Sequence, residues 1–156
     1  RTISRQNMHC KVSEIKISYK NRAREDNWHK VSSSKDAAEL IFNTWDKNTL
    51  GLQESFKVLL LNNANMVKGI YELSTGGLVG TLIDIRILFS VVLKSLSVGI
   101  ILTHNHPSGT LKASAADKDI TNKIQEAARL LDVTVLDHII IAPNGDYCSL
   151  ADEGLL

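Results

Sequence analysis

The sequence has little cysteine, almost no net charge and no long apolar run, and each of these shortages excludes a class of protein. The two cysteines, Cys10 and Cys148, are far apart and lack C-x-x-C spacing, so they predict neither a disulfide framework nor a cysteine zinc site. No apolar run approaches the roughly 18 residues of a membrane span, and the N-terminal stretch lacks the apolar centre of a signal peptide. We therefore expect a reduced, cytoplasmic protein with no membrane partner.

The 18 basic and 17 acidic residues give a formal net charge of +1, which offers no global electrostatic reason to bind nucleic acid. The charge is uneven, however. Residues 1–30 hold eight Lys/Arg and three Asp/Glu, a net +5, whereas residues 31–156 hold ten and fourteen, a net −4. A basic stretch of this kind is usually solvated surface, so we expect at most a weak DNA association through the N-terminal arm.

A chain of 156 residues with 44% hydrophobic content can bury one core and is too short for two comfortable domains. We expect an N-terminal arm over residues 1–34, with a short strand within 11–20, followed by one compact domain over residues 35–156. No internal repeat or low-complexity tract interrupts that domain.

Apolar spacing in residues 35–156 alternates between the helical period and the strand period. Ser33, with an acid three residues later, and Asp84 are predicted helix caps. We expect helices over 35–45, 85–97 and 114–132, a β-hairpin over 54–74 that turns at 62–65, and strands over 98–106, 133–142 and 147–150. This interleaved order predicts an α/β or α+β fold in which helices flank a mixed sheet.

His104 and His106 stand one residue apart at the end of the strand expected over 98–106. Side chains two residues apart in a strand point to the same face, so both imidazoles are expected to aim in one direction. Pro107 removes a backbone donor and ends the ladder, which places the pair at the end of the strand, where functional sites form.

Asp117 falls in the first turn of the helix expected over 114–132, in phase with the apolar Ile120 and Ile124. It is therefore expected to point inward, and an inward carboxylate is costly unless a positive group meets it. Two neutral imidazoles and one carboxylate make the three-ligand set of a catalytic Zn²⁺ ion, with a fourth position open for a water whose pKa falls to about 7.

Two further residues complete the expected site. Glu54 opens the strand ESFKVLLL with the parity of Phe56 and Val58, which makes it the candidate proton acceptor. Ser114, three residues before Asp117, is able to donate to a developing oxyanion. Simpler interpretations stay open: Glu54 also fits an acid at a strand entry, and Ser114 with Asp117 also fits the S-x-x-D capping box.

The other histidines are assigned no ligand role. His138, beside Asp137, is expected to be structural or to support a metal ligand from behind, and His9 and His29 are expected to be exposed. Even His104 or His106, taken singly, would more often be a surface or core histidine than a ligand.

The spacing His104-x-His106, seven residues, Ser114, two residues, Asp117 reproduces the H-x-H-x7-S-x2-D signature of the JAMM (JAB1/MPN/Mov34-type) metalloproteases. The stretches HNHPSG, LDHIII and SLADEG resemble the bacterial RadC branch of that superfamily, and the resemblance covers roughly residues 35–156. It implies a JAB/MPN-like, cytidine deaminase-like fold, with Zn²⁺ on the two histidines and Asp117. It also implies Glu54 as the general base and Ser114 as support for the oxyanion.

The resemblance implies a zinc-dependent hydrolase of the JAMM type, a metallopeptidase or isopeptidase whose substrate is a protein or peptide. The alternative is a RadC-type DNA-repair or mobile-element-associated accessory protein in which the metal site is vestigial or regulatory. Longer RadC-like chains carry an N-terminal helix-hairpin-helix segment, and residues 1–50 show no such paired helices. The H-x-E and P-C-x-x-C patterns of zinc deaminases are absent, and two-metal phosphoesterases need more clustered carboxylates than this stretch supplies.

Overall fold

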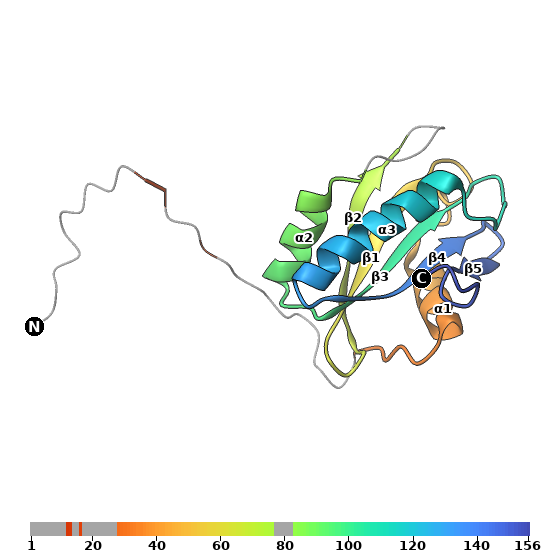
Figure 1. Ribbon diagram of the computed structural model, residues 1–156. Helices are drawn as coiled ribbons and strands as arrows, with labels where there is room; N and C mark the ends of the chain where they lie inside the picture. Colours follow the sequence, from red (N-terminus) through yellow and green to blue (C-terminus); the bar gives the residue numbers. More distant parts are fainter. Residues whose placement is uncertain (1–11, 14–15, 17–27, 77–82) are drawn as a thin grey trace, which may run out of the picture.

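The structure, a computed structural model, describes residues 12–13, 16, 28–76 and 83–156 (Figure 1). The short strand expected within residues 11–20 and most of the basic arm lie outside the described residues, as does most of the glycine-rich loop after residue 76. The weak DNA association expected of that arm therefore stays a prediction. Within the described ranges, no helix combines the length and apolar character needed to cross a membrane.

A five-stranded mixed sheet forms the centre of the domain. The strands follow the spatial order β2-β1-β3-β4-β5. β3 and β4 run parallel, whereas β1 pairs antiparallel with β2 and β3, and β5 pairs antiparallel with β4. Their bounds are β1 Ser55–Leu61, β2 Val67–Thr75, β3 Gly99–Asn105, β4 Thr134–Ile141 and β5 Tyr147–Ser149. The expected mixed sheet flanked by helices is thus confirmed.

Three helices cover the two faces of this sheet: α1 (Ser34–Thr44), α2 (Ile85–Lys94) and α3 (Ala115–Leu130). α2 and α3 lie on one face and α1 on the other (Figure 1). Each helix begins at a side chain that accepts a backbone N–H of its first turn, from the N-caps Ser33, Asp84 and Ser114. α2 ends three residues earlier than expected, because Leu96 takes a left-handed conformation with φ of 51°.

The core divides into two main layers because successive strand residues point to opposite faces of the sheet. Alternate residues of β1 and β3 pack under α2 and α3; the buried ones include Phe56, Val58, Leu60, Ile100 and Leu102. The intervening residues pack under α1 and the segment that follows it; these include Leu59, Leu61 and Ile101. All seven residues of β3 are buried, so a polar side chain on this strand must find its partners inside the protein.

The chain order brings three segments together at the carboxyl end of β3. β3, α3 and β4 form a strand–helix–strand unit with parallel strands, which places the N-terminus of α3 beside the end of β3. In the antiparallel pairing of β1 with β3, Phe56 lies opposite His104, so the residue two before Phe56 approaches the residue two after His104. Glu54, His106 and the first turn of α3 therefore meet at this edge.

Candidate metal centre

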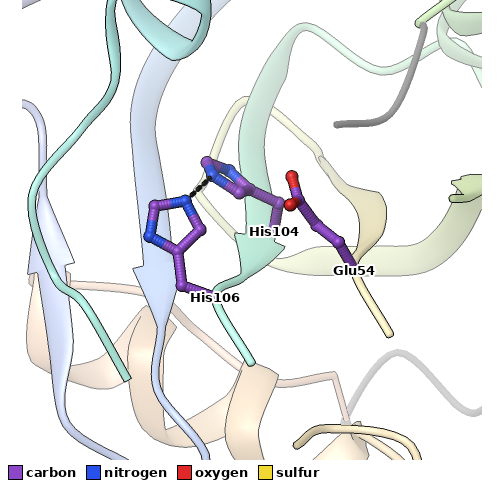
Figure 2. A group of neighbouring side chains, drawn as sticks. All are labelled: Glu54, His104 and His106. Carbon is purple, nitrogen blue, oxygen red and sulfur yellow. Dashed lines mark hydrogen bonds between the residues drawn. The ribbon is translucent and has the colours of Figure 1, made fainter. Parts of the chain in front are cut away.

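Two imidazole rings face each other at the end of β3 (Figure 2). The Nε2 atoms of His104 and His106 are 2.9 Å apart, and the rings meet edge to face with centroids 4.7 Å apart. The His104 side chain is only 1% exposed, whereas that of His106 is 15% exposed. His106 lies one residue beyond β3, and its backbone N–H still donates to the carbonyl of Ile141 in β4. The pair therefore has one buried member and one that borders solvent.

The Asp117 carboxylate meets both histidines from the first turn of α3. Its Oδ1 lies 3.2 Å from the His104 Nε2, and its Oδ2 lies 3.6 Å from the His106 Nε2. The capping box is also present: Ser114 N–H donates to Asp117 Oδ2 at 2.7 Å, and Asp117 N–H donates to Ser114 Oγ at 3.1 Å. The capping interaction thus orients the carboxylate that faces the histidines.

The donor set and its spacing suit one metal ion, and a tetrahedral zinc ion gives the reference distances. Two donors that each lie about 2.0–2.1 Å from such an ion are about 3.3 Å apart. The two Nε2 atoms are 2.9 Å apart, and His104 Nε2 lies 3.2 Å from Oδ1 and His106 Nε2 3.6 Å from Oδ2 of Asp117, so each of these distances is within about 0.5 Å of that value. Imidazole nitrogen and carboxylate oxygen are both donors that zinc accepts.

Glu54 is half-buried immediately before β1 and reaches toward the His104 ring (Figure 2). One of its oxygens and a ring nitrogen from each of His104 and His106 lie within 4.8 Å of one another, so these three residues could hold a metal ion. The structure therefore brings two carboxylates to the histidine pair. Asp117 is in contact with both Nε2 atoms, and Glu54 completes the group from the side of β1.

Asn105, between the two histidines, is a residue whose role the sequence did not reveal. Its side chain points away from them and is fully buried. Oδ1 accepts the N–H of Ser55 at 2.8 Å, and Nδ2 donates to the carbonyls of Leu50 at 2.7 Å and Gln53 at 2.9 Å. Ser55 and Gln53 flank Glu54 in the chain, so this one amide fixes the backbone on both sides of the acid.

These groups open into a cleft of about 590 Å³. Glu54, His106, Ser114 and Asp117 line it, together with Phe56, Ile83, Ala116, Asp119, Ile120 and Lys123. The exposed Ser114 hydroxyl uses its oxygen to accept from Asp117 N–H, which leaves its hydrogen free to donate into the cleft. All five residues expected at the site therefore lie together, with four on the cleft wall and His104 buried behind His106.

His138 lies behind the pair rather than in the cleft. It is fully buried, and its Nε2 is 2.7 Å from the Nδ1 of His104. The neighbouring Asp137 turns to the other side, where it accepts the Ser149 hydroxyl at 2.6 Å and the N–H of Ala151 at 3.0 Å. His29 is exposed, as expected, and His9 lies outside the described residues.

The charges of the site depend on one another. Burial alone would raise the pKa of Asp117, but its contacts with His104 and His106, which favour the ionised carboxylate, outweigh burial and hold that pKa well below its usual range. The hydrogen bond to Asp117 in turn raises the pKa of His106 above its ordinary 6.5. Burial, assisted by the nearby His104, lowers the pKa of His138 well below that value, so His138 is neutral.

Comparison with known proteins gives a consistent result. A family model described as the RadC-like JAB domain matches residues 31–155. The UPF0758 protein of Flavobacterium johnsoniae is 45% identical over 128 residues, which cover 81% of this chain and 53% of that protein. The UPF0758 protein of Porphyromonas gingivalis is 44% identical over 104 residues, which cover 67% of this chain and 46% of that protein. The UPF0758 protein of Clostridium tetani is 37% identical over 130 residues, which cover 82% of this chain and 54% of that protein. The chain spans about half the length of these curated relatives.

The mixed sheet and the histidine–carboxylate cluster define a domain of the JAMM-related superfamily of metal-dependent hydrolases. Within that superfamily, the chain belongs to the RadC-like JAB domain family. The family resemblance seen in the sequence is thus confirmed. The relatives bear the name UPF0758, which states no reaction, so the activity must be argued from the site itself.

Replacing Asn105 tests the structural support of Glu54. In Asn105→Ala, the N–H of Ser55 and the carbonyls of Leu50 and Gln53 lose their buried partner, so we expect the free energy of unfolding to fall by about 2–4 kcal/mol. Denaturant unfolding measures this loss. Asn43→Ala, at an exposed position of α1, is the control and should change stability by no more than about 0.5 kcal/mol. Equal stabilities of the two variants would contradict the assigned role.

Proposed function

We propose that this domain is a zinc-dependent hydrolase of the JAMM type that cleaves a peptide or isopeptide bond. The observation that supports this most directly is the convergence of two imidazole nitrogens and a carboxylate at 2.9, 3.2 and 3.6 Å. We assign His104, His106 and Asp117 as the zinc ligands. Membership of the RadC-like JAB domain family supports the same class of chemistry.

The hydrogen-bond partner of His106 supports its role as a ligand. Its Nδ1 lies 2.6 Å from the backbone carbonyl of Thr110. A carbonyl only accepts, so Nδ1 must carry the ring hydrogen, and in the neutral ring Nε2 keeps its lone pair. That lone pair faces the His104 Nε2 and a carboxylate oxygen, an arrangement that requires a cation or a proton between the donors.

Residues of the cleft are assigned the remaining catalytic roles. Zinc held by these ligands supplies Lewis acidity, which polarises a scissile carbonyl and makes water more acidic. Glu54 takes the proton from the attacking water and passes it to the leaving amine. Ser114 donates its free hydroxyl hydrogen to the developing oxyanion. We assign Glu54 to the base because Asp117 already contacts both Nε2 atoms, whereas Glu54 approaches them from the opposite strand.

The wall of the cleft fits a protein or peptide substrate. Phe56, Ile83 and Ile120 offer apolar surface, and Asp119 and Lys123 add one charge of each sign. A mixed wall of this kind suits a polypeptide, in which apolar and charged side chains alternate with amides, better than it suits a polyanion.

Metal content tests the ligand assignment. After reconstitution and dialysis, the chain should retain about one zinc per molecule, and His106→Ala should bind zinc at least about 100-fold more weakly, because a three-ligand site loses one ligand. His29→Ala, which removes an exposed histidine, is the matched control and should keep the metal. Elemental analysis for zinc and iron, with a chelator titration, measures both. Equal zinc binding by His106→Ala and His29→Ala would show that His106 is not a zinc ligand. Selective retention of iron by the parent chain would show that the metal is iron and not zinc.

Glu54→Gln separates a base from a ligand. The amide keeps the shape of the side chain but accepts no proton, so zinc should stay bound while turnover of peptide and isopeptide substrates falls by about 100-fold or more. Glu39→Gln, on the exposed surface of α1, is the control for loss of a carboxylate and should retain activity. Loss of zinc from Glu54→Gln would instead show that Glu54 is a ligand.

The raised pKa of His106 predicts how zinc affinity depends on pH. Below that pKa, Nε2 of His106 holds a proton that zinc must displace, and the competition begins at a higher pH than for an ordinary histidine. Apparent zinc affinity should therefore fall by about tenfold or more for each pH unit below the His106 pKa. Chelator competition between about pH 8 and about pH 5.5 measures this trend. An affinity that stays constant over that range would contradict the assignment.

A further inference from the structure

A chain of three hydrogen bonds, one part-buried and two buried, runs from the backbone of α3 to the back of His104. The Thr121 hydroxyl donates to the carbonyl of Asp117 at 2.6 Å. Its Oγ1 also lies 2.6 Å from the Nδ1 of His138. The Nε2 of His138 lies 2.7 Å from the Nδ1 of His104. The three residues Thr121, His138 and His104 are fully buried, so water has little access to the bonds between their side chains.

The partners determine where each hydrogen lies. A hydroxyl has one hydrogen, and Thr121 gives it to a carbonyl, which only accepts. The hydrogen between Thr121 and His138 must therefore come from the Nδ1 of His138. A neutral imidazole holds a single hydrogen, so the Nε2 of His138 is an acceptor and the Nδ1 of His104 must donate to it.

The chain ends on the metal-binding atom. With its hydrogen on Nδ1, a neutral His104 has its lone pair on Nε2, the atom that faces His106 and Asp117. The opposite tautomer would place a hydrogen among the donors. It would also set two lone pairs 2.7 Å apart, between His104 and His138, in a buried site.

Aromatic packing holds both rings in this arrangement. Phe56 lies parallel to the His104 ring, with an interplanar angle of 2° and centroids 5.8 Å apart. It meets the His138 ring edge-on at 64° and 5.4 Å. Rotation of either imidazole would break these contacts, so the ring nitrogens cannot exchange places without disturbing the core.

We propose that Thr121 and His138 are positioning residues, which fix His104 in the Nδ1–H tautomer and so prepare its Nε2 to bind the metal. The proposal rests on the proposed function in that the metal is zinc on His104. The hydrogen-bond chain begins at the backbone carbonyl of Asp117 and ends at His104, whose ring contacts the Asp117 carboxylate. Thr121 is therefore linked to two of the proposed ligands, Asp117 and His104. Partners behind a metal-bound histidine typically change metal affinity by about 10- to 100-fold.

Thr121→Val tests the proposal because valine keeps the shape of threonine and removes the hydroxyl. Nδ1 of His138 then loses its acceptor, and His104 is no longer confined to one tautomer. We expect zinc affinity to fall by about 10- to 100-fold. In the metal-free protein, nitrogen-15 NMR at about pH 8 should show the single Nδ1–H form of His104 give way to a mixture. Thr121→Ser, which restores a hydroxyl, should restore both readouts.

Thr103→Val is the matched control. Thr103 is buried in β3 next to His104, but its hydroxyl has no hydrogen-bond partner among the described residues. Removing that hydroxyl should leave the zinc affinity and the His104 tautomer unchanged. Thermal unfolding of each variant establishes that it is folded, and Thr121→Ala replaces Thr121→Val if the valine variant does not fold.

The outcomes separate this proposal from the proposed function. If Thr121→Val binds zinc as tightly as the parent chain and keeps His104 in the Nδ1–H form, the positioning role is wrong although the zinc site stands. If the parent chain binds no zinc, the proposed function fails, and the NMR comparison of the metal-free variants still decides whether Thr121 and His138 fix the tautomer. A parent chain that populates both tautomers of His104 equally would overturn the proposal directly.

Discussion

The constraint on which the rest of the structure depends is the meeting of three electron-pair donors within 3.6 Å at the end of β3. Two nitrogen lone pairs and a carboxylate repel one another in a partly buried place unless a positive charge lies among them. A metal ion or a proton supplies that charge, and the surrounding structure has to keep the donors together for it. The buried sheet, the helix cap and the partners of the imidazoles together meet that requirement.

The two faces of β3 contribute to the site in different ways. His104 and His106 point toward α3 and the cleft, whereas the intervening Asn105 points toward the layer covered by α1 and binds the segment around Glu54. The cap of α3 then turns Asp117 to the same point. Two segments that lie far apart in the sequence are thus set against one strand, and the rigidity of that strand limits how far the proposed ligands can drift.

Much of this could be predicted from the sequence because the signals are local. Helix caps, the strand period and the spacing of the two histidines depend on residues within a few positions of one another, and they give the helices, the mixed sheet and the five site residues. The sequence does not predict the end of α2 correctly, because the left-handed residue that ends it is Leu96 and not the glycine typical of that position. Asn105 and Thr121 were missed because their partners lie 55 and 17 residues away, and a buried polar residue does not reveal its partner in the sequence.

Asn105 and Thr121 support different parts of the site, because successive side chains of β3 point to opposite faces of the sheet. Asn105 holds the backbone around Glu54 and makes no contact with a ring nitrogen, so its contribution is to the placement of the proposed base. Thr121 acts through His138 on the opposite face and determines which nitrogen of His104 carries the lone pair. On the proposed assignment, a change at Asn105 therefore disturbs the base and leaves the metal ligands in place, whereas a change at Thr121 disturbs a metal ligand and leaves the base in place. The proposed metal ligand His104 and the proposed base Glu54 thus depend on different buried side chains, although His104 and Asn105 are adjacent in the chain.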